Sequence, residues 1–332
     1  MPSWNIEKID LPLKFDWKIS RNTSSIKSNF IVKVQDENFE GIGEVAFNTR
    51  FGESEDQVRD HFNQFLKAWN ASFYTLEEFN LCVNSLELPT SLRFGLESAW
   101  VHFSCKFFNI EMEQLLKIKG LGLLSTSFSL PIMEVGEIKS FIEENNLNRF
   151  ESLKIKDNGL QTVDVINEVN THFKGKLRID ANEAFSCPDH LITIFEKLKV
   201  IPIEFIEQPL PASMHDEYLY LKNNINFKLM ADESITTGEV TSYYKERFDG
   251  INIKLMKSGG YFTAIKQIRQ AKRLGLEIMI GCMIESSLGI SSAMNLAYGL
   301  DYFDLDGMLI IQKDPFDLVH ENNGMLIKTE LH

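Results

Sequence analysis

Five short segments decide how this chain folds: LKIKD (153–157), LRIDANEAF (177–185), FIEQPL (205–210), MADES (230–234) and INIKLMKSGG (251–260). Each contains a short apolar run that leads into a charged or amide residue. Spacings of 24, 27, 25 and 22 residues separate Lys156, Asp180, Glu207, Asp232 and Lys254. This period fits one strand, one helix and two loops, the unit of a (β/α) barrel. Because the C-terminal strand ends meet at one mouth of such a barrel, these side chains are expected to converge.

The same pattern continues through the rest of the second part of the chain. Strands are predicted near residues 126–132, 151–156, 176–182, 203–207, 228–233, 250–256, 277–284 and 302–306. Helices are predicted at 158–168, 188–198, 214–223, 239–247, 263–274 and 288–298. Alternating strands and helices indicate a parallel sheet that closes into a barrel. An open doubly wound sheet is the main alternative, but it needs a Gly-rich phosphate turn that the sequence lacks.

The first third of the chain has a different pattern. Residues 29–34 alternate as a strand, and residues 36–43 indicate a hairpin that returns through Gly41 and Gly43. Residues 17–25 are interpreted as a polar loop between the first two strands. From residue 54 to residue 119, apolar residues recur at helical spacing. Strands followed by helices predict an α+β domain.

Composition excludes several classes of partner. The net charge of −13 argues against nucleic acid, because phosphate binding requires a basic surface. No apolar run is as long as a membrane span, and the first residues lack the pattern of a signal peptide. The four cysteines are scattered, without a CxxC pair, and are expected to be buried thiols in a reducing cytoplasm. The sequence leaves open whether the protein is a homo-oligomer.

Three carboxylates, Asp180, Glu207 and Asp232, each end an apolar strand. A single acid at such a place commonly caps the following helix. Three on consecutive units, with lysines on the units before and after, favour a site for a hard cation. Oxygen ligands without His or Cys indicate Mg²⁺, with Mn²⁺ as an alternative, and do not indicate Zn²⁺.

The lysines suggest proton transfer. Lys154 and Lys156 are two residues apart on a strand and are therefore expected to point to the same side. The alternative is a solvated strand edge. A neighbouring cation and burial are expected to lower the pKa of a lysine here, which favours a role as general base. Lys254, on the sixth strand, is expected to approach a substrate from the opposite face, an arrangement that inverts a stereocentre.

These motifs (KxK, DxN, EQP, DE and a sixth-strand lysine) resemble those of the enolase superfamily, in particular its muconate-lactonising subgroup. The resemblance spans nearly the whole chain. It implies an α+β capping domain at residues 1–120, to which the tail at 316–332 returns. It also implies a modified (β/α) TIM-type barrel at residues 121–315 that carries the site.

The resemblance also implies the roles of individual residues. The metal ligands would be Asp180, Glu207 and Asp232, the acid/base pair Lys156 and Lys254, and the substrate-carboxylate contact Lys154. The motif at Asp304 and Asp306 is similar to one that holds the free ammonium group of the substrate in dipeptide epimerases. Two acids on one face of a strand end suit a cation, although a helix-capping pair is the plainer interpretation.

Further residues are expected to shape the substrate pocket. Arg21, in the segment WKISR, resembles a position that meets the side-chain carboxylate in Ala-Glu epimerases; a solvated loop charge is the alternative. Phe51, Met283 and the adjacent Ile284 are expected to line the pocket. Hydrogen-bonding support is expected from Asn182, Glu233 and Glu285.

The resemblance favours one activity and leaves others open. It implies a Mg²⁺-dependent dipeptide epimerase, an isomerase whose first candidate substrate is L-Ala-L/D-Glu from peptidoglycan turnover. The alternatives on the same scaffold are an o-succinylbenzoate synthase, whose substrate has no ammonium group, and a muconate-type cycloisomerase. A metal-binding protein that kept the fold without the chemistry is a third alternative.

Overall fold

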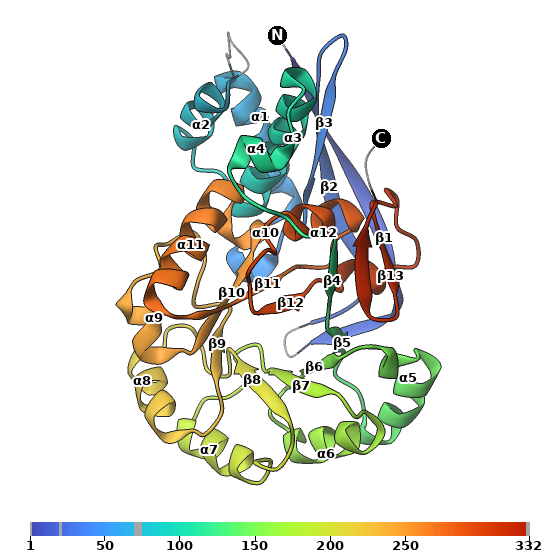
Figure 1. Cartoon of the computed structure of the whole chain (residues 1–332), viewed down its shortest axis with the longest axis vertical. Helices are drawn as coiled ribbons and strands as arrows, with labels where there is room; N and C mark the ends of the chain where they lie inside the picture. Colours follow the sequence, from blue (N-terminus) through green and yellow to red (C-terminus); the bar gives the residue numbers. More distant parts are fainter. Residues whose placement is uncertain (1, 20–21, 70–74, 330–332) are drawn as a thin grey trace.

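The computed structural model describes residues 2–19, 22–69 and 75–329. A barrel surrounded by helices forms the lower part of Figure 1, and an α+β domain forms the upper part. The barrel strands are β5 (Phe128–Leu130), β6 (Ser152–Lys156), β7 (Lys176–Asp180), β8 (Ile203–Glu207), β9 (Leu229–Ala231), β10 (Gly250–Lys254), β11 (Glu277–Gly281) and β12 (Tyr302–Asp304). They pair in sequence order, and every pair is parallel. The predicted strand positions and the barrel are confirmed.

The first and last strands of the barrel approach each other. The backbone N–H of Ser127 donates to the carbonyl oxygen of Phe303 at 3.2 Å. The N–H of Leu305 donates to the hydroxyl of Thr126 at 2.9 Å. These bonds join the ends of β5 and β12, so the sheet is nearly a closed ring.

Helices cover the outside of the ring (Figure 1). They are α5 (Ile138–Glu144), α6 (Thr162–His172), α7 (Pro188–Glu196), α8 (His215–Asn224), α9 (Ser242–Arg247), α11 (Tyr261–Leu274) and α12 (Ser287–Met294). The short helix α10 (Leu255–Ser258) follows β10 directly, where the sequence pattern predicted more strand. None of the described helices has the length and apolar composition needed to cross a membrane.

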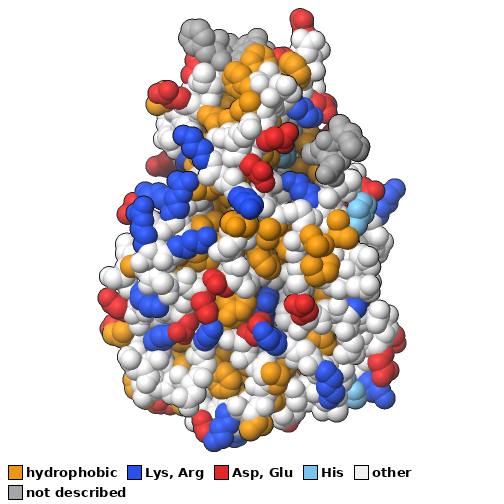
Figure 2. Space-filling view, viewed as in Figure 1, with side chains coloured by type: hydrophobic (Ala, Val, Ile, Leu, Met, Phe, Trp, Pro, Cys, Tyr) orange, Lys and Arg blue, Asp and Glu red, His pale blue; other side chains and the backbone are white. Residues whose placement is uncertain are grey.

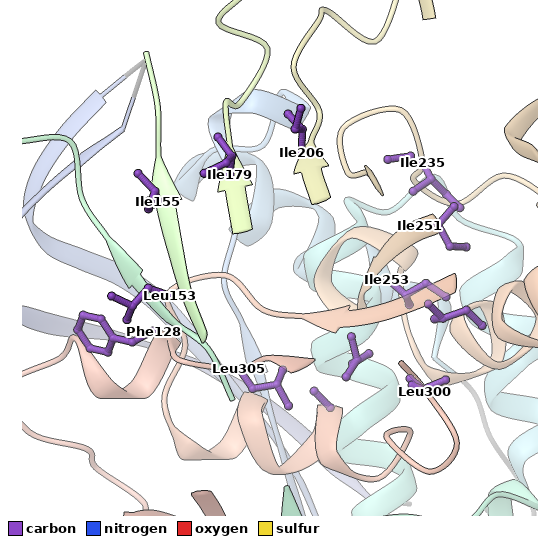
Figure 3. Packing of buried hydrophobic residues seen from close by; sticks show 14 of the residues in the cluster. Phe128, Leu153, Ile155, Ile179, Ile206, Ile235, Ile251, Ile253, Leu300 and Leu305 are labelled. Carbon is purple, nitrogen blue, oxygen red and sulfur yellow. The ribbon is translucent and has the colours of Figure 1, made fainter. Parts of the chain in front are cut away.

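Alternation along the strands separates the core from the site. Ile155, Ile179 and Ile206 are buried in the main core, which also contains helix residues, and they lie on neighbouring strands in Figure 3. Side chains one residue away point to the opposite side of the sheet, into the barrel. A small cluster that includes Phe205 and Met230 fills the barrel interior. Polar side chains at the C-terminal strand ends therefore lie on a packed floor.

The upper domain contains an antiparallel sheet of β1 (Ser3–Ile19), β2 (Asn22–Gln35) and β3 (Glu40–Val45). It is followed by α1 (Glu55–Ala68), α2 (Leu76–Asn84), α3 (Thr90–Phe108) and α4 (Met112–Leu116). An aromatic cluster holds the sheet to the helices; the rings of Trp69 and Trp100 are 4.9 Å apart. A Cβ atom at Gly43 would lie 2.1 Å from the carbonyl oxygen of Gly95, so glycine permits close packing of β3 on α3.

Two local expectations differ from the structure. The segment 17–25 was expected to be a loop, but its described residues, 17–19 and 22–25, belong to the long strands β1 and β2, in which Trp17 pairs with Ser24. Pairing between neighbouring strands outweighs the polar composition there. The four cysteines are free thiols, as expected, but Cys187 is exposed and the others are half-buried, so the expectation of buried thiols is wrong for Cys187.

The end of the chain forms a hairpin of β13 (Val319–Asn322) and β14 (Met325–Lys328). Strand β14 pairs with β4 (Leu123–Ser125), so the tail lies beside the start of the barrel domain. The contact with the cap sheet is made just before the tail, where Ile311 bridges to Leu13. On the face shown in Figure 2, acidic and basic side chains are interspersed.

Candidate active site

The charged residues singled out from the sequence lie at the C-terminal ends of barrel strands. Lys154 and Lys156 are on β6, Asp180 ends β7, Glu207 ends β8, Asp232 follows β9, Lys254 ends β10, Asp304 ends β12, and Asp306 lies two residues beyond it. All except Lys156 are buried. They lie on one floor beneath the cap, as the spacing in the sequence predicted.

The Lys154 ammonium group connects three of these strands. Its Nζ lies 2.9 Å from Asp180 Oδ2, 2.7 Å from Glu207 Oε2 and 2.7 Å from Asp304 Oδ2. Burial alone lowers the pKa of Lys154, but the surrounding carboxylates reverse this and hold it well above its usual value. The direction differs from the lowering expected, because acids, not a cation, dominate around the ammonium group. Lys154 is therefore a fixed positive charge in the floor.

Lys156 lies on the same side of β6 as Lys154. Its Nζ lies 2.6 Å from Asp180 Oδ2 and donates to Asn182 Oδ1 at 3.2 Å. Asn182 donates in turn to Glu233 Oε1 at 3.3 Å. The second lysine of the KxK motif therefore sits at the edge of the floor, where it is less buried than the first.

Lys254 lies across the ring from Lys156. In the strand order, three strands separate β6 from β10, which is half the circumference of an eight-stranded ring. Lys254 Nζ donates to Asp232 Oδ2 at 2.8 Å. Burial lowers the pKa of Lys254, but Asp232 outweighs it, and the net pKa is raised. The two lysines thus approach the centre of the floor from opposite sides.

The three carboxylates proposed as metal ligands differ in their electrostatics. Burial alone would raise the pKa of each carboxylate. Lys154 and Lys156 nevertheless bring the pKa of Asp180 below its usual range. Lys254 and Lys257 bring the pKa of Asp232 well below its usual range. Glu207 behaves differently: burial, reinforced by the charge of Asp180, raises its pKa to about 7. A buried glutamate beside another acid is stabilised by an added cation.

The donor set fits a hard divalent cation in its chemistry. Asp180, Glu207 and Asp232 offer only carboxylate oxygens, from three consecutive strands. Glu207 Oε1 accepts from Asn252 Nδ2 at 2.7 Å, while Oε2 is buried without a well-directed hydrogen bond and faces the Lys154 ammonium group. Within the described residues, no three Asp, Glu, His or Cys side chains gather as a ready-made metal cage. The Lys154 ammonium group lies between the carboxylates of Asp180 and Glu207 and offsets their negative charge.

The acid pair after β12 is held in two ways. Asp304 Oδ1 accepts from the Ser127 hydroxyl at 2.9 Å, and Oδ2 pairs with Lys154. Asp306 Oδ2 accepts from the backbone N–H of Ser129 at 2.6 Å. Burial, and then the charge of Asp304, raise the pKa of Asp306 to about 6. A cationic group beside Asp306 would relieve this buried acid.

A cavity of about 390 Å³ lies between this floor and the cap. Among the residues that line it are Lys154, Lys156, Lys254, Asp232, Glu233, Asn182, Asp304 and Asp306 from the barrel. Phe51 and Met283 also line it, at the positions where the sequence predicted pocket walls. Arg21 lies outside the described residues. Glu285 does not line the cavity but supports its wall, because it accepts a hydrogen bond from the N–H of Met283 at 2.7 Å. Burial, followed by the charge of Glu44, raises the pKa of Glu285 to about 8.

Residues 137–311 match the family model described as enolase C-terminal domain-like. This chain belongs to the enolase superfamily. The chain is 30% identical over 337 residues to an L-Ala-D/L-amino acid epimerase of Pedosphaera parvula, with 96% of this chain and 93% of that protein covered.

Two solved structures share the enolase fold of this chain. One is an enolase family member of Agrobacterium tumefaciens with homology to dipeptide epimerases, with sodium and L-Ala-L-Glu bound. Its TM-score is 0.86 at 25% identity, with 99% of this chain and 98% of that chain covered. The other is a dipeptide epimerase of Enterococcus faecalis in complex with Mg and L-Leu-L-Tyr, with a TM-score of 0.87 at 23% identity and coverage of 98% and 96%.

Several residues of this enolase-superfamily site were not predicted. Lys257, on α10, donates to Asp232 Oδ1 and to the Asp232 backbone oxygen, both at 2.5 Å. Asn252 holds Glu207 from the middle of β10. Both lie in INIKLMKSGG, where an amide and a second lysine inside a buried apolar run were the available signal.

The cap is also joined to the rim of the barrel by an ion pair. Arg50, in the 3₁₀ turn η1 (Thr49–Phe51), makes two bonds to Glu183, of 2.8 Å and 2.7 Å. Glu183 also accepts from the N–H of Ala212 at 2.8 Å. The turn that carries Phe51 is thereby fixed above the floor.

Proposed function

We propose that this enolase-superfamily isomerase is a metal-dependent dipeptide epimerase that inverts the α-carbon of the C-terminal residue. The observation that carries the proposal is the placement of Lys156 and Lys254 on strands half a ring apart, with buried carboxylates between them. A reaction that inverts a carbon needs a proton acceptor on one face and a donor on the other.

The residues proposed to hold the metal are Asp180, Glu207 and Asp232, with Mg²⁺ as the first choice and Mn²⁺ as an alternative. When bound, such a cation neutralises the negative charge that develops on a substrate carboxylate. Lys257 and Asn252 fix the orientation of Asp232 and Glu207, respectively. The Mg in the Enterococcus faecalis structure agrees with this choice.

The chain's own residues would handle the substrate and its protons. The Lys154 ammonium would bind the substrate carboxylate. One of Lys156 and Lys254, in its neutral form, would accept the α-proton while the electron pair of the C–H bond moves into the carboxylate as an enolate. The ammonium of the other lysine would deliver a proton to the opposite face, and for the reverse epimer the roles would exchange.

The substrate would be a dipeptide with a free amino group. Asp304 and Asp306 supply buried acidic oxygens in the floor for its ammonium, and the raised pKa of Asp306 is consistent with a site that gains from a cation. L-Ala-L/D-Glu, a product of peptidoglycan turnover, is the first candidate. The bound L-Ala-L-Glu in the Agrobacterium tumefaciens structure supports this candidate.

The direct test is proton exchange in D₂O, followed by NMR across a dipeptide panel, with Mg²⁺ and then with EDTA. We expect deuterium to enter the α-carbon of the C-terminal residue, at a rate that falls to background when the metal is removed. Exchange at the N-terminal α-carbon, or exchange that is indifferent to EDTA, would contradict the proposal. Turnover of an o-succinylbenzoate precursor without any dipeptide exchange would replace it with the lyase alternative.

A further inference from the structure

One cation in the wall of the cavity between floor and cap has no ion-pair partner among the described residues. Of the described residues, five cationic side chains line this cavity: Lys27, Arg50, Lys154, Lys156 and Lys254. All but Lys27 have a carboxylate oxygen within 2.9 Å. Among the described residues, no acid lies within ion-pair distance of the Lys27 ammonium group. Lys27 therefore faces the cavity without a direct ion-pair partner among the described residues.

The described partners of the Lys27 ammonium group are a backbone carbonyl and an aromatic ring. From strand β2, its Nζ donates to the carbonyl oxygen of Phe47 at 2.6 Å and lies 4.9 Å from the centre of the Phe47 ring. An ammonium group has three N–H donors, so two remain for other partners. Burial lowers the pKa of Lys27 to about 8, which leaves it mostly protonated at neutral pH. A half-buried ammonium with few partners gains more from an anion than a fully exposed one does.

The nearest acids are already engaged elsewhere. Glu44 accepts from Asn29 and from Ser286. Glu53 accepts from the N–H of Ser91 and from that of Asn48, and Glu285 is held by Met283. Their charges raise the pKa of Lys27, but burial outweighs them. The protein thus keeps these acids in its own network and leaves the Lys27 ammonium to the cavity.

We propose that Lys27 binds an anionic side chain of the substrate, which makes acidic dipeptides the preferred substrate class. This inference rests on the proposed function. The substrate carboxylate and ammonium would be held at the barrel floor, whereas Lys27 lies on the cap wall. The group that reaches it is therefore a side chain, and a carboxylate there forms a charge-assisted hydrogen bond.

The test compares isosteric substrates with Lys27→Met. The pairs are L-Ala-L-Glu with L-Ala-L-Gln, and L-Glu-L-Ala with L-Gln-L-Ala, and the pair that responds identifies the residue whose side chain is bound. For the acidic member of one pair, we expect Lys27→Met to lower kcat/KM by roughly ten- to a hundredfold, the size of one charge-assisted bond. For the neutral member, we expect a change of less than about threefold.

Lys33→Met is the matched control. Lys33 is on the same strand, pairs with Glu40 at 2.5 Å and does not line the cavity. It should leave the preference for acid over amide unchanged. If Lys27→Met lowered kcat/KM equally for acid and amide, Lys27 would be structural and the inference would be wrong. A wild-type protein without preference for the acid would overturn it too.

A binding measurement separates this inference from the proposed function. Calorimetric titration with L-Ala-L-Glu, L-Ala-L-Gln and the reversed pair, each in Mg²⁺ buffer, gives the affinities directly. Binding of an acidic dipeptide that depends on Lys27, without any proton exchange, would refute epimerisation and retain Lys27 as the anion site. Proton exchange on dipeptides that does not depend on Lys27 would retain epimerisation and refute Lys27 as the anion site. Neither binding nor exchange would refute both.

Discussion

Replacement of Lys257 by methionine tests whether Lys257 holds the Asp232 carboxylate in the orientation that binds a metal. The lysine side chain is 1% exposed and makes three contacts: to Asp232 Oδ1 and Asp232 O at 2.5 Å, and to Asn252 O at 2.9 Å. One charge-assisted hydrogen bond contributes roughly 1.5–3 kcal/mol. Asp232 keeps Lys254 at 2.8 Å, and a buried methionine avoids the cost of burying an ammonium group.

We therefore expect Lys257→Met to lower the free energy of unfolding by about 2 kcal/mol. We expect an effect of similar size at the site, where the affinity for Mg²⁺ should fall roughly ten- to a hundredfold, as for other residues that orient a metal ligand. Urea denaturation gives the first quantity and calorimetric titration with Mg²⁺ the second. Lys33→Met, which breaks only a surface ion pair, should change stability by less than about 1 kcal/mol.

If Lys257→Met bound Mg²⁺ as tightly as the wild type, Lys257 would not orient Asp232 for the metal. A loss of stability alone would mean that Lys257 serves the core and not the orientation of Asp232. An unchanged stability together with an unchanged affinity would mean that the short contacts contribute nothing net.

Three further outcomes follow from the structure. Gly43→Ala should lower the free energy of unfolding by more than about 2 kcal/mol, because its Cβ would meet the Gly95 carbonyl at 2.1 Å; thermal unfolding that matches the wild type would contradict this. Burial lowers the pKa of His102 from 6.5 to about 4, so its stabilising effect is complete above pH 6.5 and is lost as pH falls through 4, by on the order of 3 kcal/mol. His102→Gln should therefore gain stability relative to the wild type between pH 7 and pH 4, and a constant difference in urea denaturation would refute the assignment. Arg50→Met removes two bonds to Glu183 and should raise KM more than it lowers kcat; a pure loss of kcat would place Arg50 elsewhere in the reaction.

The fold was predictable because the barrel strands are buried on both faces. Such strands are near-continuous apolar runs, so β6, β7 and β8 were visible in sequence, and the charged residue that ends each gave the period. The hairpin β13–β14 and strand β4 were not predicted, because they are short and depend on pairing between distant segments. The β1–β2 hairpin extends through a polar segment for the same reason.

The candidate site was predictable in its members but not in their interactions. The motif spacing placed Lys154 and Asp180 at one mouth, yet three carboxylates around Lys154 reverse the direction of its pKa shift. The number of carboxylates around Lys154 depends on which strands are neighbours in the ring, and a local sequence pattern does not give that order. Lys257 was missed because a short helix turns it back towards Asp232. Lys27 was missed because its place in the cavity wall, without a direct ion pair among the described residues, is apparent only in three dimensions.

The central claim is that Lys156 and Lys254 serve opposite faces of one carbon. The measurement that tests it most directly is NMR-detected α-proton exchange in D₂O for each epimer of an active dipeptide, with Lys156→Ala and with Lys254→Ala. Each variant should lose the conversion of one epimer into the other while retaining exchange of only one epimer, and the retained epimer should differ between the two variants. If Lys254→Ala still interconverted both epimers, or if both variants retained exchange of the same epimer, the two-base arrangement would be wrong.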